Sequence, residues 1–174
     1  MYSKNVLNKT SIQVGALLSL WAIALVIATQ SGLLSTLYLP VISLIIGATI
    51  ALPTLWYRKS PLLQAWMNYI GRRRIVAFHI WRIPAALLFF HFGLRGELPS
   101  AFWVLAGVGD LAAGIHAVFV TLQKSPTVED YKRFHFFGFA DFVVAVGTGM
   151  TYTLLQDPRM SLIAVLPFAF VPLF

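Results

Sequence analysis

Apolar stretches follow one another along the whole sequence with only short polar breaks between them, and this pattern leaves few folds open. A helix needs about 20 mostly apolar residues to cross a bilayer. Helices also satisfy their own backbone hydrogen bonds in lipid, and none of the stretches alternates apolar and polar residues as a spanning strand does. We therefore predict an all-α, polytopic membrane bundle of about six helices that forms one domain. The expected spans are 14–30, 36–56, 75–94, 101–122, 134–155 and 161–174.

The composition agrees with this assignment. Hydrophobic residues make up 59% of the 174 residues and charged residues only 11%, whereas soluble domains average about 25% charged residues. The first stretch lacks a small-residue cleavage pattern, so we expect a retained helix and not a signal peptide. Cysteine is absent from the sequence, which excludes disulfides, thiolate-bound zinc, iron–sulfur ligation and covalent haem attachment.

Basic residues collect on one side of the predicted bundle. Ten of them fall there, namely Lys4, Lys9, Arg58, Lys59, Arg72, Arg73, Arg74, Lys124, Lys132 and Arg133. Arg95 and Arg159 fall on the other side, and Arg82 lies within a span. Because cytoplasmic loops carry an excess of Lys and Arg, we expect both termini to be cytoplasmic. The net charge of +7 then reflects membrane orientation, and no nucleic-acid partner is expected.

Two shorter segments modify the picture. Residues 61–70 are rich in apolar and aromatic side chains and precede three arginines, so we predict a short helix lying in the membrane interface. An anchoring elbow is favoured there over a specific lipid site. The last stretch, 161–174, would extend only about 21 Å as a helix, which is short of a core of about 30 Å. Pro167 and Pro172 interrupt it, so either the natural chain continues or this element is a broken or half-buried helix.

Ionisable side chains inside the spans are candidates for function, because such groups are costly in lipid. Pairing the helix ends places Arg82, His116 and Asp141 in one layer, with His79 within a turn of it and Asp110 about a turn nearer the outside. We expect these five residues to line a buried polar site. His91 and His135 fall near helix ends and are assigned no part in it.

The charges of this predicted site do not cancel. One arginine cannot neutralise two ionised aspartates, so a titratable proton is expected, and we place it on Asp110, where desolvation is strongest. A static network in which one aspartate stays protonated and ties helices together is the alternative. Gly107, Gly114 and Gly138 lie on the same faces as the aspartates and are expected to let neighbouring helices approach closely.

Haem ligation and hydrolysis are two other kinds of chemistry for which the sequence contains candidate residues. His79 and His116 fall at similar depth on consecutive helices, and two neutral imidazoles at such a separation could ligate one b-type haem. Hydrolase chemistry is not supported, because Ser100 and Ser125 fall in loops without a matched histidine and acid. No catalytic residue and no metal ligand is assigned, and an enzyme is not the favoured interpretation.

A family resemblance rests on the segment from His79 to Gly114. It contains Arg82, the loop Gly96-Glu97-Leu98-Pro99, Phe102 and the run Ala106-Gly107-Val108-Gly109-Asp110, and it is followed later by Gly138, Asp141 and an ending from Pro167 to Pro172. This pattern resembles a family of small uncharacterised bacterial inner-membrane proteins, over about the second half of the chain. The resemblance implies a helical protein of the bacterial inner membrane, with a shortened carboxyl end. It brings no activity to Arg82, Asp110 or Asp141.

These observations predict an integral membrane protein whose buried site supports proton-linked transport of a small solute or ion. The main alternative is a non-catalytic accessory subunit that docks through its small-residue faces in a larger membrane assembly. Binding of haem b is a third and less favoured alternative. The expected partners are the lipid bilayer and, under the second hypothesis, other membrane subunits.

Overall fold

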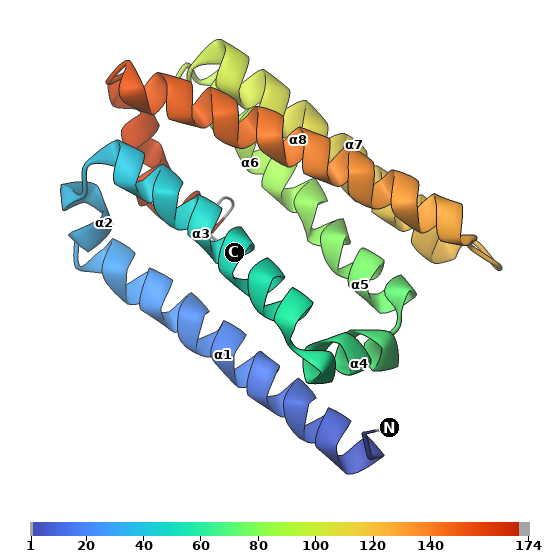
Figure 1. The fold of residues 1–174 in the computed structure, drawn as a ribbon. Helices are drawn as coiled ribbons and strands as arrows, with labels where there is room; N and C mark the ends of the chain where they lie inside the picture. The colour runs from blue at the N-terminus through green and yellow to red at the C-terminus, as the bar shows by residue number, and fades with distance from the viewer. Residues whose placement is uncertain (1, 171–174) are drawn as a thin grey trace. The chain divides into compact units, whose positions relative to one another are not determined.

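The computed structural model describes residues 2–170, and this part of the chain is helical with no β-strand. Figure 1 shows its order of helices. The chain divides into two compact units, one formed by Met1–Gly71 with Ile163–Phe174 and the other by Arg72–Leu162. The all-α prediction is confirmed, and the single transmembrane domain stays a prediction.

The first unit contains α1 (Lys4–Gln30), α2 (Leu33–Thr36), α3 (Leu39–Lys59) and α4 (Pro61–Ile70). The helix α4 has the bounds predicted for the interfacial helix. Its start is explained by Ser60, whose hydroxyl accepts a hydrogen bond from the Leu63 N–H, and by Pro61 in the first helical position. The positive φ of Gly71 then ends the helix in a conformation that favours glycine.

Two aromatic side chains connect α4 to the beginning of α1. Trp66 donates its indole N–H to the Ser11 hydroxyl at 2.9 Å, and the Tyr69 hydroxyl donates to the Asn8 side-chain oxygen at 2.8 Å. Both rings can therefore lie on apolar surroundings while their polar atoms are satisfied. These bonds hold α4 against the polar end of α1.

The second unit contains α5 (Arg72–Phe78), the 3-10 turn η1 (His79–Trp81), α6 (Arg82–Leu94), α7 (Ser100–Leu122), α8 (Val128–Leu154) and most of the 3-10 helix η2 (Pro158–Ala164). The central helix is α7, which packs against both α6 and α8. Its buried face consists largely of small residues, including Ala106, Gly107, Ala113 and Gly114. A capping box between Thr127 and Asp130 starts α8.

Five helical segments among residues 2–170 are long and apolar enough to cross a membrane. They are Lys4–Gln30, Pro40–Lys59, Arg72–Leu94, Ser100–Leu122 and Val128–Leu154. They contain nearly all of the first five predicted spans, and several start earlier than expected, because polar residues such as Lys4 and Glu129 continue the helix beyond its apolar part.

The sixth predicted span is not present as a helix of spanning length in the described residues. Its first residues belong to η2, and turns follow from Val165, while residues 171–174 lie outside the described part. Proline supplies no N–H to continue a helix, and the segment is short, so a six-span bundle is not confirmed. The cytoplasmic location of both termini stays a prediction.

The packing of α7 on α6 makes a prediction about glycine. A Cβ at Gly114 would lie 2.6 Å from the Ile83 side chain and 3.0 Å from its backbone nitrogen, whereas a Cβ at Gly147 on α8 would meet no described atom within 4 Å. We expect Gly114→Ala to lower stability by about 1–3 kcal/mol through overpacking. Gly147→Ala should be neutral or stabilise by up to about 1 kcal/mol, through helix propensity. Thermal unfolding of both variants in detergent tests this, and equal melting temperatures would contradict the close approach.

Candidate functional site

Three charged side chains come from the middle of three apolar segments. Arg82 is the first residue of α6, directly after the 3-10 turn, and lies near the centre of the continuous segment Arg72–Leu94. Asp110 and Asp141 lie near the centres of α7 and α8. Ionised groups at such positions need partners, because water is scarce at that depth.

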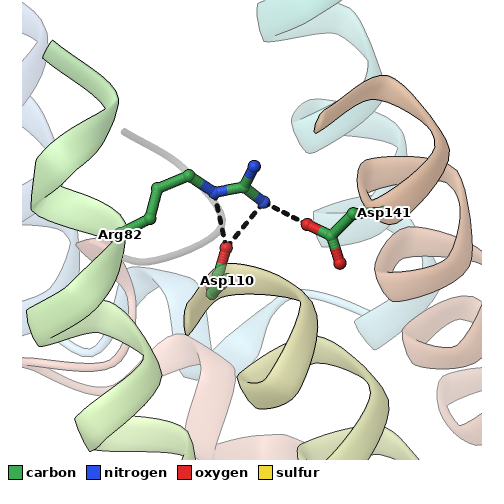
Figure 2. A network of polar contacts seen from close by, with 3 residues as sticks. All are labelled: Arg82, Asp110 and Asp141. Atoms are coloured by element: carbon green, nitrogen blue, oxygen red, sulfur yellow. Dashed lines mark hydrogen bonds and ion pairs between the residues drawn. The ribbon is translucent and has the colours of Figure 1, made fainter. Parts of the chain in front are cut away.

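The guanidinium of Arg82 bonds both aspartates (Figure 2). Its Nε donates to Asp110 Oδ1 at 2.6 Å, and its Nη2 lies 2.6 Å from the same oxygen. The same Nη2 donates to Asp141 Oδ2. The side chains of Arg82, Asp110 and Asp141 are only 15%, 11% and 5% exposed. One cation thus links three helices, and we call these three residues the Arg–Asp triad.

This geometry differs from the expected layering. The depth estimate placed Asp110 a turn away from Arg82, but the long arginine side chain reaches both carboxylates. Contact with Arg82 therefore does not by itself distinguish the two carboxylates as carriers of the proton. Among the described residues, Asp110 Oδ2, Asp141 Oδ1 and Arg82 Nη1 have no hydrogen-bond partner. With both aspartates ionised, the triad carries one surplus negative charge.

A glycine that had no predicted role makes room for the triad. A Cβ built on Gly109 would lie only 1.6 Å from Asp141 Oδ1, so any other residue would displace that carboxylate. Gly138, on α8, is different, because its Cβ would meet Arg82 Nη1 at an ordinary 3.7 Å. Gly107 and Gly114 lie where α6 approaches α7. The spacing of Gly109 next to Asp110 could have drawn attention to it, but only the fold brings Asp141 over it.

The two histidines assigned to the site lie elsewhere in this unit. The rings of His79 and His116 pack against Phe134, with centroids 5.3 Å and 5.5 Å from its ring. Neither forms an ion pair or hydrogen bond with the triad among the described residues. Phe134 is 2% exposed and belongs to a core cluster with Val76, Ala117 and Val120. The expected five-residue site thus separates into the triad and an aromatic histidine cluster.

This arrangement does not fit a haem ligated by both histidines. The Phe134 ring is nearly equidistant from the two imidazole rings, so its centre lies close to the plane midway between them. A porphyrin bound to both imidazoles would have to occupy that same plane. Phe134 would therefore have to leave the core. As a separate finding, the described residues contain no group of three or more His, Cys, Asp or Glu side chains that could hold a metal ion.

Comparison with known proteins places the chain in a family. Residues 39–174 match the model of a family described as a domain of unknown function (DUF8737). The chain belongs to this family. No curated protein and no solved structure matches it.

The DUF8737 domain extends further toward the amino terminus than the resemblance recognised in the second half of the chain. It starts at the beginning of α3 and covers the whole second unit, so the complete Arg–Asp triad lies inside it. The helix α1 precedes the match.

Gly109 offers a test of the triad within the DUF8737 domain. Gly109→Ala should destabilise the protein by about 1–3 kcal/mol, because the new methyl group collides with the Asp141 carboxylate. Most of this loss should vanish in the Asp141→Ala background, where the colliding atoms are gone. Gly138→Ala is the matched control and should be tolerated. Thermal stability in detergent completes the double-mutant cycle, and additive effects of Gly109→Ala and Asp141→Ala would rule out the contact.

Proposed function

We propose that this protein is an integral membrane protein that moves a small solute or ion in a manner linked to a proton held by the Arg–Asp triad. The observation that carries the proposal is the guanidinium of Arg82 shared by Asp110 and Asp141 in the middle of three apolar helices. A simple structural tie between helices would need only one carboxylate for one guanidinium. A structural role alone therefore does not explain the second carboxylate.

The surplus charge sets the chemistry of the proposal. An uncompensated carboxylate in a membrane interior is costly, so the triad binds one proton or one other cation. Both aspartates contact the same guanidinium. A proton bound there belongs to the coupled pair and not to either residue alone. Uptake and release of that proton is the step to which transport of a solute would be coupled.

Infrared spectroscopy tests this proton directly. The parent protein should show one protonated carboxylic acid per chain near neutral pH. Asp110→Asn and Asp141→Asn should each abolish this band, because one arginine and one aspartate form a neutral pair that needs no proton. Arg82→Leu should increase the band, since both carboxyl groups then lack a cation.

The pH dependence of the band separates an exchangeable proton from a static tie. A permanent proton would keep the carboxylic-acid band at every pH at which the protein stays folded, whereas an exchangeable proton is released and the band is lost as the pH rises. No band in the parent protein would remove the surplus-charge argument and the proposed function with it. A pH-dependent flux in liposomes, lost in both Asn variants, is the corresponding functional result.

A second function is favoured by the surface of α1. Side chains such as Ile12, Leu20 and Ile27 are more than half exposed, and the helix lies outside the family match. A helix of this kind can dock on other membrane subunits, as an accessory subunit would. Purification in mild detergent tests this alternative: a stoichiometric partner that is lost on removing α1 favours the accessory role, and a homogeneous free chain argues against it.

The proposed location is the bacterial inner membrane with the amino terminus in the cytoplasm, supported by the distribution of basic residues. The loop between α7 and α8, which contains Lys124, should then be cytoplasmic, and the loop around Glu97 should be external. Reporter fusions at these positions test the orientation. An external signal from the loop at Lys124 would overturn it.

A further inference from the structure

An open groove of about 380 Å³ runs between α7 and α8, within the second unit. Leu105 and Val108 line it from α7, and Phe137 and Val144 line it from α8. Among the described residues that line it, Asp141 alone is charged. The volume falls in the range of sites for small molecules, which are mostly apolar with a few placed polar groups.

Asp141 is one of the residues that line this groove. Its Oδ2 is bonded to Arg82, while its Oδ1 has no hydrogen-bond partner among the described residues and lies over Gly109, which also lines the groove. The side chain is only 5% exposed. A nearly buried carboxylate oxygen without a hydrogen-bond partner among the described residues thus belongs to the lining of an otherwise apolar groove.

Charge and apolarity together define what this groove accepts. We propose that it binds a small apolar cation, whose positive charge replaces the proton of the Arg–Asp triad. A neutral apolar molecule or a lipid chain would fill the walls but leave the surplus negative charge uncompensated, and an apolar anion would add to it. The inference rests on the proposed function and names its substrate class, with proton and cation competing for one negative charge.

The test uses tetraphenylphosphonium as the probe and tetraphenylborate, of nearly equal size and shape but opposite charge, as the matched control. Binding to the full chain in lipid nanodiscs is measured by equilibrium dialysis. We expect saturable binding of the cation alone. Affinity should rise with pH, by up to about tenfold per pH unit, while the triad gives up its proton in exchange. Equal binding of both ions would show a site for apolar molecules in general, such as lipid chains, and would overturn the proposal.

Variants separate the groove from the proton. Asp141→Asn should weaken cation binding at least tenfold, and an unchanged affinity would overturn the proposal. Leu105→Trp should block the groove and abolish binding while keeping the carboxylic-acid band. Leu122→Trp, at a 72% exposed position on the same helix away from the groove, should bind as the parent does.

The failures of the two proposals give different results. A parent protein that shows the carboxylic-acid band but binds no cation overturns the substrate class and leaves the proton site standing. Cation binding that depends on Asp141 but occurs without any band in the parent overturns proton exchange and the proposed function, and leaves only the groove.

Discussion

The contact between one guanidinium and two carboxylates is the constraint on which the second unit depends. A lone charge at the middle of a span costs at least about 2.5 kcal/mol, so Arg82 requires a carboxylate and each ionised aspartate requires Arg82. The bonds can form only if α6, α7 and α8 stand at matching depth and face each other across α7. Close packing at Gly114 and the space at Gly109 meet these two conditions. Close helix packing and charge pairing therefore depend on the same arrangement of α6, α7 and α8.

The second carboxylate distinguishes the triad from an ordinary buried ion pair. A pair of one guanidinium and one carboxylate is neutral, whereas the triad carries one surplus negative charge when both aspartates are ionised. The apolar groove adds a route by which that charge could come from a molecule and not only from a proton, because Asp141 belongs to both features. His79 and His116 pack on Phe134 and form no hydrogen bond or ion pair with the triad among the described residues.

Much of the fold was predictable because apolar length dictates it. Spacing along the sequence predicted five helices that are long and apolar enough to cross a membrane, and also the helix at residues 61–70. It also predicted that Arg82 and Asp141 lie in one layer, as their contact requires. Errors arose where local geometry departs from a uniform helix. The 3-10 turn at His79–Trp81 winds more tightly than an α-helix and separates His79 from the helix that begins at Arg82. Three features depend on tertiary contacts that the periodicity of a sequence does not encode. They are the reach of the Arg82 side chain to both aspartates, the space that Gly109 leaves for Asp141, and the conformation of the short segment after Pro158.

The central claim is that both aspartates share Arg82 within the bilayer. Solid-state NMR of protein in lipid bilayers, labelled with nitrogen-15 in arginine and carbon-13 in aspartate, measures this most directly. We predict that the guanidinium nitrogens of Arg82 correlate with two different carboxyl carbons, and that Asp110→Asn and Asp141→Asn each remove one correlation. A single correlation in the parent protein, or none, would contradict the shared contact and every conclusion drawn from it.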